Sequence, residues 1–200
     1  IMNQRNIWQR IVGTIVTVVV LGGAIYFFTM SKSQQSAPRE AIMLDASSAK
    51  STYKAGEEIR VDAHLKNSGE VDTCVSTMGA GNIRTVSFTR DGESVETRST
   101  PVYFITSFDK MLEVSLVPVK PGESLDIMLS SELDDGLQKQ ALRTTSLDDG
   151  RGIAMFYDIE TPGDYQLKLV YEYPGPKSSN CAHVFGEETN IAVVTFTVIP

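Results

Sequence analysis

An uninterrupted apolar segment near the start of the sequence constrains this chain more than any other feature. Residues 11–28 read IVGTIVTVVVLGGAIYFF and contain no charged side chain, and Thr29 and Met30 extend the segment to residue 30. At 1.5 Å per helical residue, about 20 residues span roughly 30 Å, the thickness of the hydrocarbon core of a bilayer. We therefore predict a transmembrane helix over residues 11–30, preceded by a cytoplasmic tail over residues 1–10.

A cleaved secretory signal peptide is the main alternative interpretation of this segment. Signal peptides usually have a shorter apolar stretch that ends at small residues before the cleavage site. Residues 22–24 (GGA) could form such a site, but the apolar run continues to Phe28. The sequence therefore favours a retained signal-anchor, with Trp8 and Tyr26 where aromatic side chains collect at the two membrane interfaces.

The charges beside the helix do not decide its orientation, because Arg5 and Arg10 precede it and Lys32 and Arg39 follow it. Long C-terminal domains cross membranes largely regardless of charge, so we expect the domain to lie outside the cytoplasm. The chain contains no N-x-Ser/Thr glycosylation site. This absence favours the periplasm or cell surface of a bacterium over a eukaryotic ectodomain.

The rest of the chain consists of a polar linker over residues 31–40 (SKSQQSAPRE) and one domain over residues 41–200. Arg5 and Arg10 are the only two of the 18 basic residues that precede the apolar segment, and all 25 acidic residues follow it. The part beyond the segment therefore has a net charge of −9. This charge argues against nucleic acid or an anionic lipid surface as a partner.

After residue 40 the hydrophobic pattern has a period of two. In residues 59–66 apolar side chains alternate with polar ones, which predicts a half-buried strand. Further strands are predicted over residues 83–90, 95–99, 112–117, 125–130, 153–158, 165–173 and 191–199. Turn dipeptides such as Asp91-Gly92 separate them, and a short helix is considered only for residues 137–145. This pattern predicts an all-β antiparallel sandwich.

Two parts of the domain resemble bacterial immunoglobulin-like domains. Residues 53–59 (YKAGEEI) and 65–69 (LKNSG) resemble the region of the second strand. Residues 161–167 (TPGDYQL) resemble the approach to the penultimate strand, with Tyr165 where a tyrosine corner would lie. Leu167 occupies the place of a cysteine in antibody domains, so no antibody-type core disulfide is implied. The resemblance implies an immunoglobulin-like fold and no particular function.

The two cysteines, Cys74 and Cys181, lie in the part expected in an oxidising compartment, where such a pair is predicted to form a disulfide. The resemblance implies that their loops, residues 70–82 and 174–190, lie at the same end of the sandwich as the start of the domain. We therefore expect both loops to face the membrane or a protein embedded in it. The residues predicted for this partner surface are Gly79, Asn82, Pro176, Val184 and Phe185.

A third segment, residues 101–108 (PVYFITSF), contains three aromatic side chains that do not alternate cleanly. Tyr103, Phe104 and Phe108 therefore either belong to the core or form part of a partner-facing surface.

The sequence contains little that indicates bound cofactors. Residues 181–183 (CAH), with Cys74 and His64, allow a copper site, but such sites also group methionine near the last strand and no methionine follows Met155. No cofactor or metal is predicted.

Two acidic repeats and the absence of common catalytic motifs bear on calcium binding and on catalysis. The repeats LDDG, at residues 133–136 and 147–150, do not fit the spacing of a twelve-residue calcium loop and are interpreted as turns. No Gly-x-Ser-x-Gly, His-Glu-x-x-His or phosphate-binding loop occurs. The sequence therefore does not indicate an enzyme.

These observations predict a non-catalytic, membrane-anchored accessory subunit. Its extracytoplasmic domain would bind and position integral membrane subunits of a larger respiratory, photosynthetic, transport or secretory complex. An alternative is a free-standing binding module, such as an adhesin, a solute binder or a protease inhibitor. A third hypothesis is a copper or redox carrier.

Overall fold

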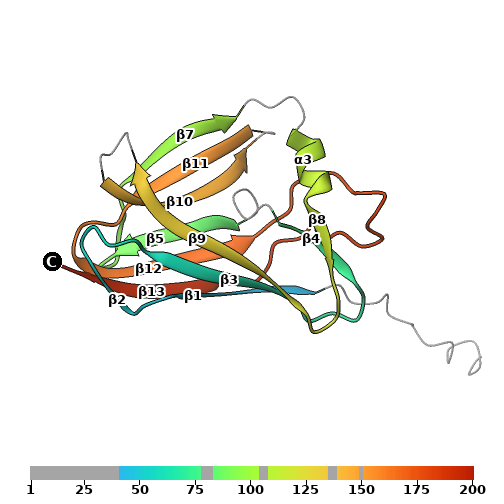
Figure 1. Cartoon of the computed structure of the whole chain (residues 1–200), viewed down its shortest axis with the longest axis horizontal. Helices are drawn as coiled ribbons and strands as arrows, with labels where there is room; N and C mark the ends of the chain where they lie inside the picture. The colour runs from blue at the N-terminus through green and yellow to red at the C-terminus, as the bar shows by residue number, and fades with distance from the viewer. Residues whose placement is uncertain (1–40, 78–82, 104–107, 135–138, 149–150) are drawn as a thin grey trace, which may run out of the picture. The chain divides into compact units, whose positions relative to one another are not determined.

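The computed structural model describes residues 41–77, 83–103, 108–134, 139–148 and 151–200 (Figure 1). The chain from Pro38 onward forms one compact unit. Its elements are almost all strands, paired mainly antiparallel. The predicted all-β antiparallel class is confirmed.

The strands form two large sheets and one small one. The six-stranded sheet has the order β1 (Ile42–Ser48), β3 (Arg60–Asn67), β9 (Ser124–Asp134), β10 (Lys139–Asp148), β11 (Arg151–Asp158) and β7 (Thr97–Tyr103). The five-stranded sheet has the order β2 (Thr52–Lys54), β13 (Ala192–Ile199), β12 (Gly163–Tyr171), β5 (Ile83–Arg90) and β6 (Glu93–Ser94). The small sheet pairs β4 (Thr73–Ser76) with β8 (Leu116–Val119), and helix α3 (Phe108–Val114) precedes β8.

The two large sheets share one hydrophobic core, as expected of a sandwich. Burial alternates along β1 and β13, so every second side chain points inward. The ring of Phe88 in β5 lies 5.3 Å, between centroids, from that of Tyr157 in β11 and thus connects the two sheets. Tyr165 and Phe196 stack with their centroids 5.1 Å apart. This aromatic cluster supplies a large share of the apolar area that folding buries.

The start of the domain is divided between the two sheets. Strand β1 pairs with β3, whereas β2, a few residues later, pairs in parallel with β13. The chain enters the domain beside Ser68, whose backbone N–H donates to the carbonyl oxygen of Ala41 at 2.8 Å. In Figure 1 this end of the domain also carries β4 and β8.

Two predicted elements are wrong. Of residues 137–145, considered as a helix, the described residues 139–145 belong instead to β10, because β9 and β11 pair with it on both sides. The strand predicted over residues 112–117 is divided between the end of α3 and the start of β8.

The predicted transmembrane helix (residues 11–30), the tail before it and the linker over residues 31–40 lie outside the described residues, as do Trp8 and Tyr26. Within the described ranges, no helix has both the length and the apolar character that a membrane span requires.

Candidate functional site

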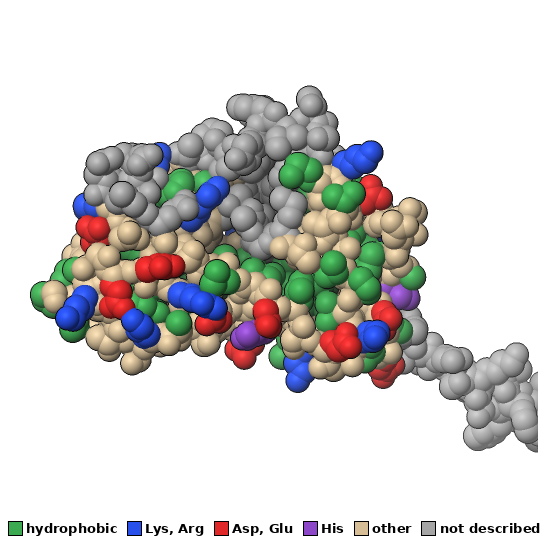
Figure 2. Space-filling view, in the orientation of Figure 1, with side chains coloured by type: hydrophobic (Ala, Val, Ile, Leu, Met, Phe, Trp, Pro, Cys, Tyr) green, Lys and Arg blue, Asp and Glu red, His purple; other side chains and the backbone are tan. Residues whose placement is uncertain are grey.

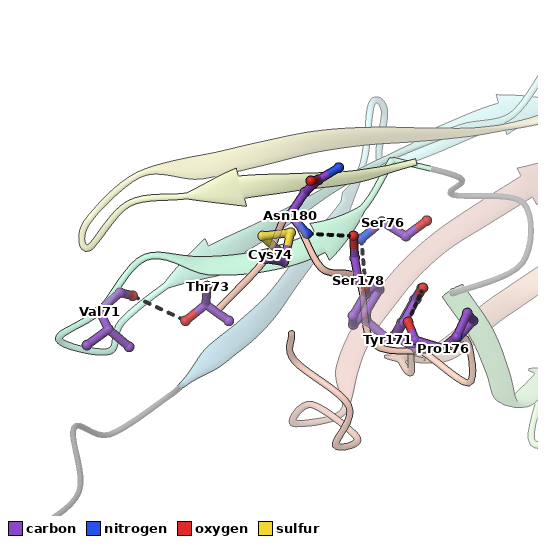
Figure 3. Close-up of a disulfide and its surroundings, with 10 residues drawn as sticks. Val71, Thr73, Cys74, Ser76, Tyr171, Pro176, Ser178 and Asn180 are labelled. Carbon is purple, nitrogen blue, oxygen red and sulfur yellow. Dashed lines mark hydrogen bonds between the residues drawn. A yellow bond between two sulfur atoms is a disulfide. The ribbon is translucent and has the colours of Figure 1, made fainter. Parts of the chain in front are cut away.

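Residues 172–190, which lie between β12 and β13, are attached to β4 by a disulfide, and we call them the disulfide loop. Cys74 of β4 is bonded to Cys181 of the loop, with their Cα atoms 6.1 Å apart and the residues 107 positions apart in sequence (Figure 3). The predicted bridge is confirmed. Because both sulfur atoms are bonded to each other, neither is available as the thiolate ligand that a copper site of the kind considered above requires.

Backbone hydrogen bonds fix the disulfide loop at the same point. The N–H of Cys74 donates to the carbonyl oxygen of His183 at 2.8 Å, and the N–H of Phe185 donates to the carbonyl oxygen of Cys74 at 3.1 Å. The residues around Val184 therefore run parallel to β4 as a short additional strand. Covalent and backbone restraints act together on this part of the loop.

Tyr171, the last residue of β12, supports the loop from the core. Its hydroxyl oxygen accepts a hydrogen bond from the N–H of Ser76 at 2.8 Å, and its ring lies 6.2 Å from that of Phe185. Burial raises the pKa of the Tyr171 phenol well above its ordinary value. Phe185 is only 5% exposed, so its assignment to a partner surface is wrong: the ring belongs to the core.

Polar contacts hold the two ends of the disulfide loop. Arg84 of β5 forms ion pairs with Glu172 and Glu188, which brings the first and last parts of the loop together. These pairs are exposed and contribute little energy. The side-chain amide of Asn190 donates to the carbonyl oxygen of Leu44 and accepts from its N–H, both at 2.9 Å. The Asn190 amide thus forms hydrogen bonds with the N–H and the carbonyl group of Leu44 on the edge of β1.

The disulfide loop presents a mixed polar surface to solvent. Pro176, predicted for the partner surface, is exposed, and Val184 is half-buried against the core. The other exposed residues include Pro174, Lys177, Ser179, Asn180, Ala182 and Glu187. Gly79, Asn82 and Phe104 lie outside the described residues, as do the side chains of Tyr103 and Phe108. The structure therefore places two of the predicted residues, Pro176 and Val184, on the loop surface.

Helix α3 exposes two apolar side chains that the sequence analysis did not single out. Val114 is 73% exposed and Met111 is 38% exposed. They are three positions apart and therefore lie on one face of the helix. Figure 2 shows hydrophobic side chains around α3 and β8. The prediction of a strand over residues 112–117 concealed this face, because a strand would bury every second side chain.

Charged side chains form no single-sign field on the visible face. Figure 2 shows basic and acidic groups interspersed there. His64 Nδ1 lies 2.7 Å from Asp126 Oδ1 on the exposed face of the six-stranded sheet. Among the residues that the structure describes, no three His, Cys, Asp or Glu side chains approach closely enough to hold a metal ion. The charge distribution is that of an ordinary solvated surface.

Comparisons with known proteins identify no family. No protein-family model matches the chain, and no curated protein sequence is similar to it. One solved structure that matches the chain is described as AvmM, which catalyses macrocyclisation in alchivemycin A biosynthesis. The match covers 81% of this chain and 90% of that one, at 11% sequence identity and a TM-score of 0.34. A similarity of this degree carries no information about function.

Proposed function

We propose that this chain is a non-catalytic, membrane-anchored accessory subunit whose extracytoplasmic β-sandwich binds and positions protein partners in a larger membrane complex. The observation that carries the proposal is the position of the disulfide loop. The Asn190–Leu44 hydrogen bonds attach the end of this loop to β1, close to the residue at which the chain enters the domain. The end of the disulfide loop thus lies beside the first strand of the described domain, which begins at residue 41.

The apolar segment over residues 11–30 supports a membrane location. It is long enough to cross a bilayer and contains no charged side chain. The polar residues 31–40 span at most about 35 Å when fully extended. Partners of the disulfide loop are therefore proteins within or close to the same membrane.

Within the broad β-sandwich class, we assign the domain to the immunoglobulin-like group. The hydroxyl of Tyr165 donates to the carbonyl oxygen of Thr161 at 2.6 Å, which is the hydrogen bond of a tyrosine corner. The division of the first strand between two sheets, as β1 and β2, supports the same assignment. Domains of this kind commonly act as recognition modules, although the fold alone does not define a function.

Lysine crosslinking in native membranes tests the proposal. Lys177 is exposed on the disulfide loop, and Lys54 is exposed on β2, which pairs with the C-terminal end of β13. We expect crosslinks from Lys177 to integral membrane proteins, lost in Lys177→Arg and retained in Lys54→Arg. Gentle extraction in detergent is then expected to yield the same partners at fixed stoichiometry.

Other outcomes distinguish the alternatives. Extraction as a monomer, with crosslinks only from Lys54, would favour the hypothesis of a free-standing binding module over that of an accessory subunit. Recovery of the full chain in the soluble fraction after alkaline carbonate washing would contradict the predicted membrane anchor. Bound copper in the purified protein would favour the electron-carrier hypothesis.

A further inference from the structure

The outer face of the five-stranded sheet carries a polar groove that plays no part in the proposal above. It has a volume of about 490 Å³, within the range of roughly 300–1,000 Å³ typical of small-molecule sites. It lies where β12 begins, whereas the disulfide loop lies where β12 ends. The side chains that form it include Thr89, Asp91, Asp164, Gln166, Thr195 and Thr197.

The strand register arranges these side chains in rows. Gln166 of β12 lies opposite Thr89 of β5 on one side and Thr195 of β13 on the other. In the next outward-facing row, Asp164 lies opposite Thr197. Neighbouring strands are about 4.8 Å apart, so adjacent polar groups in a row are separated by about that distance. The groove therefore presents a regular array of hydroxyl, amide and carboxylate groups.

The two carboxylates of the groove are held in place by the protein. Asp91 Oδ1 accepts from the backbone N–H of Asp164 at 2.9 Å, and Asp164 Oδ1 accepts from the hydroxyl of Thr197 at 2.7 Å. Asp91 also donates its N–H to the carbonyl oxygen of Asp164 at 2.8 Å. Each carboxylate thus has one oxygen fixed by the protein and a second oxygen that accepts no hydrogen bond from the described residues.

The floor of the groove is rigid. Tyr165 and Phe196 form part of the lining, and their rings stack on the core side with an interplanar angle of 9°. Both residues are at least 97% buried. The polar side chains of β12 and β13 that form the groove therefore project from strand positions directly beside two buried aromatic residues. A site on packed strands holds its polar groups more accurately than one on loops, which reduces the cost of ordering them when a ligand binds.

The chemistry of the lining selects among ligand classes. The described residues that line the groove include two carboxylates and no lysine or arginine, so an anionic ligand would be repelled there. The side chains of Thr89, Gln166 and Thr195 form no hydrogen bond with other described residues. Hydroxyls and amides both donate and accept, and carboxylates accept from hydroxyls. A neutral ligand rich in hydroxyl groups can form hydrogen bonds with all of these side chains at the same time.

We propose that this groove binds a neutral saccharide. The vicinal hydroxyls of a sugar donate to the second oxygens of Asp91 and Asp164 and exchange hydrogen bonds with Thr195 and Gln166. The sugar is either a soluble oligosaccharide or part of an insoluble polysaccharide of the cell envelope. The two sources present the same chemistry to the groove.

Binding to defined sugars tests the proposal. The full chain is purified in a polyoxyethylene detergent, because glycosidic detergents carry a competing sugar. Maltohexaose, cellohexaose, mannohexaose and chitohexaose are titrated by calorimetry, and insoluble cellulose and chitin are used in co-sedimentation. We expect binding in at least one arm, and the arm identifies the source. Thr195→Val and Gln166→Ala are each expected to weaken it about 3- to 10-fold, the effect of losing one hydrogen bond.

The matched control is Thr97→Val, which removes the hydroxyl of another exposed strand threonine, on β7. Thr97→Val is expected to bind as the unchanged protein does, and all three variants are expected to keep its circular dichroism spectrum. The proposal is overturned if no sugar binds in either arm, or if the three variants weaken binding equally. Binding of calcium or spermidine in place of every sugar also overturns it and assigns the carboxylates to a cation.

Discussion

Reduction of the disulfide between Cys74 and Cys181 measures how much of the domain's stability depends on attaching the disulfide loop. The bond closes a loop of 107 positions in the unfolded chain. Chain entropy gives 2.1 + 1.5R ln n cal/mol/K for such a loop, which corresponds to about 4.8 kcal/mol at 25 °C. This figure is an upper bound on the loss caused by reduction, because the entropic account neglects structure that remains in the unfolded chain.

We expect reduced protein to be about 3–4.5 kcal/mol less stable than oxidised protein in urea-induced unfolding followed by circular dichroism. The dependence of the free energy on urea is also expected to steepen, because the unfolded chain without the bridge is more expanded and exposes more surface. Non-reducing peptide mapping of the same samples checks that the oxidised form carries the bridge.

Reduction leaves both sulfur atoms in place and therefore adds no cavity. The double variant Cys74→Ala with Cys181→Ala removes them as well, and Cys74 is only 4% exposed, so a further loss of about 1 kcal/mol is expected from the smaller side chain. A loss below about 1 kcal/mol in the reduced unchanged protein would refute the reasoning. It would mean that the backbone bonds around Val184 and the support from Tyr171 hold the loop without the bridge.

Three smaller predictions use the same unfolding assay. Tyr165→Phe is expected to cost about 1–2 kcal/mol, because the carbonyl oxygen of Thr161 loses its 2.6 Å hydrogen bond, and an unchanged midpoint would argue against the tyrosine corner. Asn190→Ala is expected to cost about 1–3 kcal/mol, because the amide no longer meets either backbone group of Leu44; Asn180→Ala, on the exposed part of the loop, is the control. The free energy of unfolding is expected to fall above pH 10, because burial raises the pKa of Tyr165 and Tyr171 in the folded state and the unfolded chain therefore loses these protons first. The loss approaches about 1.4 kcal/mol per pH unit for each tyrosine. If Tyr171→Phe leaves the dependence of stability on pH unchanged, the prediction is contradicted.

The strands that the sequence predicts well are those with one face in the core and one in water. The prediction over residues 83–90 coincides with β5, and those over 153–158 and 191–199 lie almost within β11 and β13. Strand β4 was not predicted, because all four of its residues are buried and no alternation appears. The misassigned segment of β10 contains good helix formers, and its pairing with β9 and β11 outweighs that local preference.

The candidate site was predictable only in part, because several of its contacts join residues that are far apart in the sequence. The disulfide was predicted from two cysteines expected in an oxidising compartment, and the structure contains it. The burial of Phe185 depends on its contact with Tyr171, which has no sequence signal because the two rings meet only after the loop folds back. The saccharide groove combines side chains from β5, β12 and β13 that are unremarkable singly, since threonine is common on exposed strands.

The disulfide loop is longer than the connection between β12 and β13 requires, which bears on the proposed recognition role. Strands β12 and β13 are antiparallel neighbours, and a turn of about two to five residues is enough to join such a pair. The chain instead orders residues 172–190 at a cost of about 1–2 kcal/mol of backbone entropy for each residue. It then restrains them with a disulfide, a backbone bridge to β4 and the amide of Asn190. A shorter connection would be more stable and would need none of these restraints. Selection for stability alone therefore does not explain the loop, whereas the proposed protein partner would require such a fixed surface.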